Sequence, residues 1–206
     1  MKLYHSIGPN PRVVTMFMAE KGIEIPRVTV DLMAGENRQA THLARNPGGQ
    51  MPTLELDDGR YLSEITAICE YLEECHPTPP LIGANAEERA MTRMWTRRVD
   101  LYIVEPMLTG FRAAEGFQLF KDRMRLLPQA AADLKTLAQE KITWLDGLIG
   151  GRDFIAGNRF TLADILLFCM LDFGATVGQP INRDNKNIAA WFDRVNTRPS
   201  VEASKR

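Results

Sequence analysis

The chain has 206 residues, 45% of them hydrophobic and 25% charged, so it is long and apolar enough for one large or two small folded domains. Lysine and arginine number 25 and aspartate and glutamate 26, for a formal charge of −1, which argues against nucleic acid or an anionic membrane as a partner. No apolar run approaches the roughly 18 residues that span a bilayer, and no apolar leader opens the chain. We therefore expect a cytoplasmic protein without membrane segments.

The cysteines also limit the possible classes. Cys69, Cys75 and Cys169 are odd in number and have neither C-x-x-C nor zinc-site spacing. We therefore expect no disulfide framework and no metal site, which is consistent with a reducing compartment.

The first part of the chain alternates between strand and helix patterns. Residues 2–5 predict a strand, and a turn-rich stretch follows. Apolar residues from position 12 then predict a helix with Pro11 in its first turn, and Lys21-Gly22 is a typical helix end. Residues 26–32 alternate with period two and predict a second strand.

The next stretch predicts a loop, a hairpin and a helix. Residues 33–49 are polar and end in Asn-Pro-Gly-Gly, a loop signature. Residues 53–56 predict a strand, and the Asp-Gly turn that follows predicts an antiparallel return at 61–62. Ser63 is expected to cap a helix from Glu64 to about Cys75.

After a proline-rich segment at 76–80 only helical patterns remain. The predicted helices cover 87–115 with Pro106 as a kink, 128–148, a strongly apolar one at 161–173, and 187–196. Thr161 and Asp164 have the spacing of a capping box at the start of the apolar helix. We predict a small α/β domain at 1–80, a linker at 81–86 and an all-helical domain at 87–206.

Four segments, in this order, resemble the cytosolic glutathione S-transferases of bacterial type. They are the strand-turn-helix opening from Leu3 through Pro9-Asn10 to Gly22, then Asn46-Pro47-Gly48-Gly49-Gln50-Met51-Pro52, then Leu62-Ser63-Glu64-Ile65-Thr66-Ala67-Ile68, and finally the stretch from Phe154 to Asp164. The resemblance implies a thioredoxin-like N-terminal domain that binds glutathione, a helical C-terminal domain that shapes the site for a second substrate, and a homodimer.

The resemblance also implies a set of glutathione-binding residues. Met51 would pair its backbone with the cysteinyl part of glutathione, next to Gln50 and a cis peptide before Pro52. Glu64 and the backbone N–H of Ile65, at the start of a helix, would bind the γ-glutamyl part; a local helix-dipole role is the alternative for Glu64. The family usually has Ser or Thr where this chain has Ile65, so one hydroxyl donor is missing.

The chemistry of such an enzyme requires a donor that stabilises the glutathione thiolate. The candidates after the first strand are Tyr4, His5, Ser6 and Asn10. Asn10 occupies the position of the active cysteine in beta-class members and of the asparagine of the Pro-Asn pair in nu-class members, and an amide N–H can donate to a thiolate. Helix capping by Asn10, or Ser6 as the donor, are the alternatives.

The resemblance implies addition of the glutathione thiolate to a small hydrophobic electrophile. Reduction of disulfides or peroxides by glutathione, or a non-catalytic ligand-binding role, are the alternative functions. Tyr102, Met107 and Phe111 are candidates for the second-substrate pocket, although core packing explains such residues at helical spacing equally well.

Overall fold

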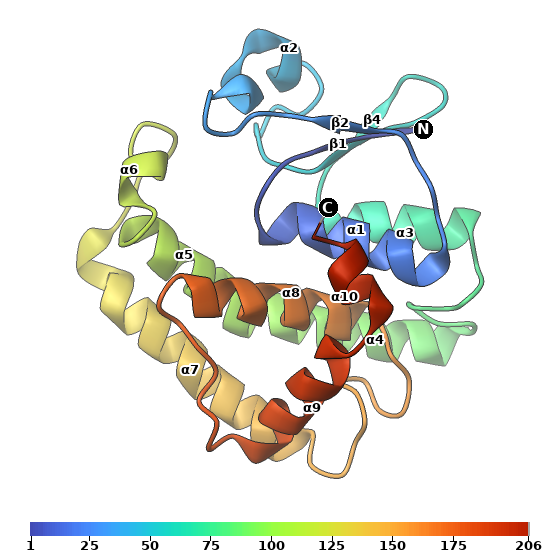
Figure 1. Cartoon of the computed structure of the whole chain (residues 1–206), viewed down its shortest axis with the longest axis vertical. Coiled ribbons are helices and arrows are strands. Elements are labelled where there is room, and N and C mark those ends of the chain that lie inside the picture. The colour runs from blue at the N-terminus through green and yellow to red at the C-terminus, as the bar shows by residue number, and fades with distance from the viewer. Residues whose placement is uncertain (206) are drawn as a thin grey trace. The chain divides into compact units, whose positions relative to one another are not determined.

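The computed structural model describes residues 1–205 and contains a four-stranded sheet followed by helices (Figure 1). The chain divides into two compact units. The first is residues 1–82 together with the segment from Pro199 onward, and the second is residues 83–198.

The sheet of the first unit has the order β2-β1-β3-β4. Strand β1 (Lys2–His5) pairs in parallel with β2 (Arg27–Thr29) and antiparallel with β3 (Thr53–Glu55), and β3 pairs antiparallel with β4 (Tyr61–Leu62). The predicted hairpin between the last two strands is confirmed. Strand β2 is shorter than the predicted 26–32 and its three residues are exposed, as suits the edge of a sheet.

Helices α1 (Pro9–Lys21) and α3 (Ile65–Cys75) lie side by side on one face of this sheet (Figure 1). Helix α1 begins at Pro9, so Pro11 lies in its first turn as predicted. The helix ends at Lys21, and Gly22, with a φ of 64°, forms the predicted left-handed C-cap. The core between helices and sheet includes the fully buried Leu3, Phe17 and Leu54.

Two parts of the first unit differ from the prediction. Residues 33–49 are not one long loop, because they contain the 3₁₀ turn η1 (Glu36–Arg38) and the short helix α2 (Ala40–Leu43). The helix expected from position 64 begins one residue later, and its N-cap is Glu64 rather than Ser63. Helix α10 (Pro199–Ala203), which the sequence did not predict, packs against α1.

The regular elements described in the second unit are helices, and an isolated bridge joins Phe154 and Gly157 in one of the connections. The helix predicted from 87 to 115 is divided into α4 (Ala86–Val99), the π-helical stretch η2 (Asp100–Val104) and α5 (Glu105–Ala113), with Pro106 in the first turn of α5. The joint expected near this proline is therefore confirmed, because proline cannot donate the backbone bond that a continuous helix needs. The chain continues through α6 (Phe117–Phe120) and η3 (Pro128–Ala130).

Helix α8 (Leu162–Thr176) is the core of this unit and packs on α4 and α9 (Lys186–Asn196), while α7 (Ala131–Leu148) packs on α5. The predicted capping box is confirmed: the side chains of Thr161 and Asp164 each satisfy the other residue's backbone N–H. Asp164 also accepts hydrogen bonds from the Ile155 N–H and the Trp191 indole, both at 2.9 Å. Burial raises the pKa of Asp164, and these hydrogen bonds act in the opposite direction.

Candidate glutathione site

The segment from Asn46 to Met51 is positioned by two buried asparagines. Asn46 donates to the Gln50 carbonyl at 2.9 Å and accepts from the Gly48 N–H at 3.1 Å, and Asn37 donates to the Gly49 carbonyl at 2.6 Å. Asn46 belongs to the predicted loop signature, whereas no sequence pattern singles out Asn37. An asparagine two residues before a glycine is a signal for a side-chain-closed turn, which would have identified the first of them.

Gly49 completes this turn. Its φ of 60° favours glycine, and a β-carbon at this position would collide with the Arg38 side chain and the Asn37 carbonyl. The turn therefore delivers Gln50 and Met51 to the start of β3 in one fixed conformation.

The Met51-Pro52 peptide is cis, as the resemblance implied. The Met51 side chain is buried with Tyr4 and Val30. Within residues 1–205, neither the backbone N–H nor the carbonyl of Met51 takes part in a hydrogen bond. Such a pair of backbone groups fits an extended ligand that hydrogen-bonds like an added strand.

The start of α3 offers a second set of unused donors. No side chain in the described part of the chain caps this helix, so the N–H groups of its first turn are available to an anion, with the positive end of the helix dipole behind them. Ile65 is half-buried at this position and supplies only its backbone.

Glu64 is held in an unusual conformation at the same place. Its φ of 69° and ψ of 120° make it the one non-glycine residue with positive φ in the described part of the chain. Such a conformation costs about 1–3 kcal/mol and concentrates at functional sites. The carboxylate of Glu64 is exposed and has no hydrogen bond or ion pair within residues 1–205.

Of the four candidate thiolate donors near the start of α1, three have other partners. The Tyr4 hydroxyl donates to Glu55 at 2.7 Å, and burial, followed by this hydrogen bond, raises its pKa. His5 lies 3.4 Å from the Thr29 hydroxyl, and burial lowers its pKa, as does Arg27. The Ser6 hydroxyl donates to the Val30 carbonyl at 2.5 Å, so its one proton is already engaged.

Asn10 differs from these three. It is the second residue of α1, whose N-cap is Gly8, so the alternative that Asn10 caps the helix is wrong. Its side chain is half-buried and has no hydrogen-bond partner in the described chain. Asn10 therefore combines a free amide with the N-terminal end of a helix dipole.

The three residues expected in a second-substrate pocket are in different surroundings. Tyr102, on η2, is 43% exposed and packs edge-on to Trp144 of α7 with 5.9 Å between ring centroids. Met107, on α5, is only 1% exposed, which agrees with the core-packing alternative. Phe111 is half-buried and packs against Phe120 and Phe173 instead.

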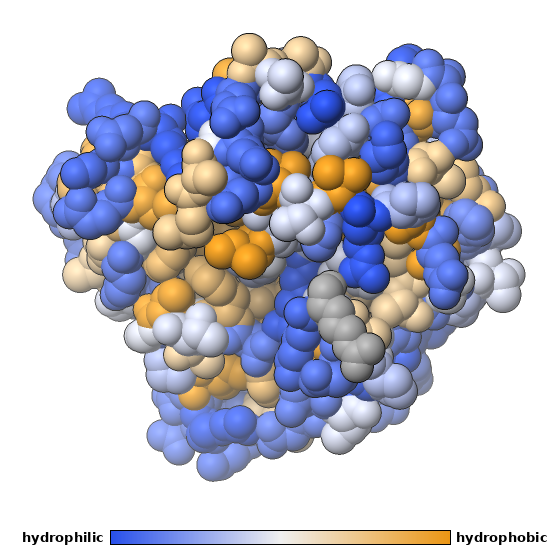
Figure 2. Space-filling model, turned by 45° about the horizontal axis from the view of Figure 1, so that its top comes forward, coloured by the Kyte–Doolittle hydropathy of each residue, from blue (hydrophilic) through white to orange (hydrophobic). Residues whose placement is uncertain are grey.

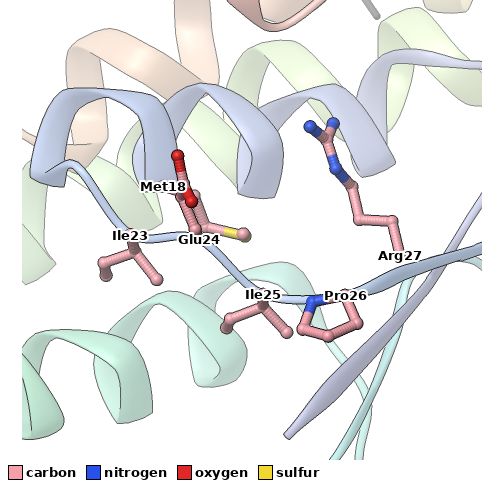
Figure 3. Close-up of a pocket in the computed structure, with 6 residues that line it drawn as sticks. All are labelled: Met18, Ile23, Glu24, Ile25, Pro26 and Arg27. Atoms are coloured by element: carbon pink, nitrogen blue, oxygen red, sulfur yellow. The ribbon is translucent and has the colours of Figure 1, made fainter.

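A surface hollow of about 480 Å³ lies elsewhere in the first unit, between the end of α1 and the start of β2. Ile23 and Ile25 point to one side of the connecting segment there and Arg27 to the other (Figure 3). None of the predicted site residues lines it.

On the face shown in Figure 2, hydrophobic areas are interrupted by hydrophilic side chains. Within the described residues no helix is long and apolar enough to cross a membrane, and no group of three acidic, His or Cys side chains could hold a metal.

The sheet with α1 and α3 on one face, followed by a helical unit, defines the class of thioredoxin-like proteins with an all-helical second half. The N-terminal domain profile of the glutathione S-transferases matches residues 7–75, and their C-terminal domain profile matches residues 101–199. The chain is 31% identical to glutathione S-transferase 2 of Saccharomyces cerevisiae over 95% of this chain and 84% of the yeast protein.

Other relatives agree over similar lengths. Glutathione S-transferase GstA of Escherichia coli O157:H7 is 30% identical, over 98% of this chain and 96% of its own. The crystal structure of a glutathione S-transferase domain-containing protein from Marinobacter aquaeolei VT8 superposes with a TM-score of 0.92 at 34% identity, covering 98% of this chain and all of that one. The chain belongs to the glutathione S-transferase family of enzymes.

Proposed function

We propose that residues 1–80 bind glutathione through the features assembled around Met51 and α3. The backbone of Met51 pairs with the cysteinyl unit, while Gln50 and Pro52 hold that backbone in place. The first-turn N–H groups of α3, that of Ile65 among them, bind the γ-glutamyl carboxylate, and Glu64 binds the ammonium group. The unused hydrogen-bonding groups at all three places support this assignment.

Asn10 donates its amide N–H to the glutathione sulfur and, with the N-terminus of α1, lowers the pKa of the bound thiol. The single observation that carries this proposal is the Asn10 amide in the first turn of α1, which has no hydrogen-bond partner among the described residues. Ser6 is the less favoured donor because its proton is engaged by Val30.

The proposed reaction is conjugation. The thiolate sulfur forms a bond to an electrophilic carbon of a small hydrophobic substrate, and the leaving group departs with its bonding electron pair. None of the chain's own cysteines is among the proposed site residues: Cys69 and Cys75 follow the first turn of α3, and Cys169 is buried in α8. Half-buried Phe111 and exposed Tyr102 are the pocket residues best placed to contact such a substrate, whereas Met107 would support them from the core.

Glutathione-dependent reduction of a disulfide or peroxide is the second candidate, because Pro9-Asn10 resembles the nu-class pair. Two assays with the same enzyme preparation separate the reactions: conjugation of a chloro-dinitroaromatic compound, and reduction of a small mixed disulfide. We expect the first to be faster than the reaction without enzyme and the second to be the lesser activity. If the enzyme turns over the mixed disulfide but not the chloro-dinitroaromatic compound, the reaction is reduction rather than conjugation.

We further propose that the protein is a cytoplasmic homodimer in which residues 87–206 shape the second-substrate site. An exposed apolar face on α7, formed by Leu137, Trp144 and Leu148, each about two-fifths exposed, supports a protein contact. Light scattering of wild type and Trp144→Glu tests this. We expect a dimer that the substitution weakens, and a wild-type monomer would contradict it.

A further inference from the structure

Three phenylalanines from three helices form a half-buried aromatic cluster in the second unit. Phe111 of α5 packs edge-on to Phe120 of α6 and Phe173 of α8, with 6.1 and 5.0 Å between ring centroids. A β-carbon on Gly116 would come within 3.2 Å of the Phe111 and Phe120 rings, so this glycine lets the two rings approach the chain closely. Phe168 is fully buried, whereas these three residues are only partly buried.

An arginine lies at this cluster. The guanidinium carbon of Arg112 is 5.9 Å from the centroid of the Phe120 ring. Arg112 is half-buried, and within residues 1–205 it makes no hydrogen bond or ion pair. Burial lowers the pKa of Arg112, and the negative charge of Glu105 offsets only part of that effect.

The neighbouring charges do not supply the missing partner. Glu115, three residues along the chain, forms an ion pair with Lys135. Arg123 adds a second guanidinium 5.7 Å from the Phe120 ring. The surroundings of Phe120 are therefore both aromatic and positively charged.

A partly desolvated guanidinium with no anion loses hydration without regaining it from the protein. A carboxylate or sulfonate would compensate for the lost hydration through charge-assisted hydrogen bonds, which the planar guanidinium makes in pairs. A flat apolar ring attached to the acid would pack edge-on or offset against the phenylalanines.

We propose that Arg112 recognises the acidic group of an aromatic second substrate whose ring packs on Phe111, Phe120 and Phe173. This inference rests on the proposed conjugation reaction and narrows its electrophile to aromatic acids. A chloro-dinitrobenzoate is such an acid: in its conjugation the glutathione thiolate forms the carbon–sulfur bond, chloride leaves with the carbon–chlorine bonding pair, and the carboxylate is unchanged.

The test compares an acid with its uncharged isostere. Calorimetry of the full chain measures binding of the unreactive dinitrobenzoate and dinitrobenzamide, and steady-state kinetics measure their chloro derivatives as substrates. The variants are Arg112→Met, Arg112→Lys and, as a matched loss of positive charge, Arg125→Met at an exposed position. We expect wild type and Arg125→Met to prefer the acid by about tenfold to a hundredfold, Arg112→Met to lose the preference, and Arg112→Lys to keep part of it.

Equal binding of acid and amide by wild type would overturn the proposal, as would an acid preference that survives in Arg112→Met. If Arg112→Met raises the KM for glutathione and leaves the acid preference unchanged, the arginine contacts glutathione instead. That result would also overturn the proposal. Because the calorimetry needs no turnover, a protein that binds the acid but conjugates neither chloro compound would contradict the proposed reaction and leave the acid site supported.

Discussion

At the scale of single residues, the proposed glutathione chemistry depends most on Asn10 and Glu64, which lie at the starts of two helices. Both have polar groups without a partner inside residues 1–205, and both sit where a helix dipole favours an anion. Glu64 also keeps a strained backbone conformation. Unpaired groups and local strain at the same place are typical of a site prepared for a ligand rather than for stability alone.

Replacing Asn10 tests its role at the sulfur. Asn10→Ala removes the amide donor, so we expect the apparent pKa of the bound glutathione thiol to rise by about one unit, equivalent to a hydrogen bond of about 1.4 kcal/mol. The measurement is the pH dependence of kcat/KM for a chloro-dinitroaromatic substrate. A profile that is unchanged in Asn10→Ala and shifted in Ser6→Ala would transfer the role to Ser6.

Ile65 offers a gain-of-function test. Ile65→Ser adds the hydroxyl that the family usually has at this position, and one added hydrogen bond to a carboxylate should lower the KM for glutathione by about tenfold. Ile65→Ala is the control, because it removes the same apolar bulk without adding a donor. Equal KM values for the two variants would show that this side chain does not face the ligand.

At the scale of elements, strong local patterns predicted most of the fold. The Asp-Gly hairpin, the Gly22 helix end and the capping box at Thr161 were all correct, because each depends on a few neighbouring residues. Helices α2 and α10 were missed because they are only 4 and 5 residues long and depend on packing with distant parts of the chain. The unpartnered backbone of Met51 and the strain at Glu64 likewise arise from tertiary structure.

A buried ion pair joins α1, α3 and the segment that leaves the first unit. The Lys21 ammonium donates to Glu73 and to the Pro79 carbonyl, each at 2.6 Å, and Glu73 also accepts from the N–H groups of Leu81 and Ile82. The Lys21 side chain is 0% exposed and that of Glu73 5%, so solvent screens the pair little. This network fixes the end of the first unit to its two helices.

Breaking this pair should be costly. Lys21→Met leaves Glu73 buried without its cation, and we expect the free energy of unfolding in urea to fall by about 3–5 kcal/mol. The control is Lys2→Met, which removes a surface lysine 3.7 Å from Glu55 and should cost less than about 1 kcal/mol. Similar losses in the two variants would contradict a special contribution from the buried pair.

At the scale of the whole molecule, the proposed functions fall on different units. The candidate glutathione groups all lie in the first unit, and the aromatic cluster with Arg112 lies in the second. The formal net charge is only −1, so we expect the proposed recognition to depend on local groups such as Glu64 and Arg112 rather than on the electrostatic field of the whole protein.

Global stability should depend on pH through His42. This residue is 2% exposed, and burial lowers its pKa below the value of about 6.5 that it has when unfolded. The unfolded chain therefore binds its proton first as the pH falls, so stability present above about pH 6.5 is lost below it, and His5 adds in the same direction.

Urea unfolding between neutral and mildly acidic pH measures this loss. We expect His42→Gln to flatten the decline, and His76→Gln, at an exposed position, to leave it unchanged. A decline as steep in His42→Gln as in wild type would assign it to other groups.

Calorimetric titration of the full chain with glutathione tests the central claim most directly. We predict binding by wild type, binding about tenfold weaker in Glu64→Gln because the ammonium loses its ionic partner, and unchanged binding in Glu74→Gln at the other end of α3. Absence of binding by wild type at millimolar glutathione, or equal affinity of wild type and Glu64→Gln, would contradict the site as assigned.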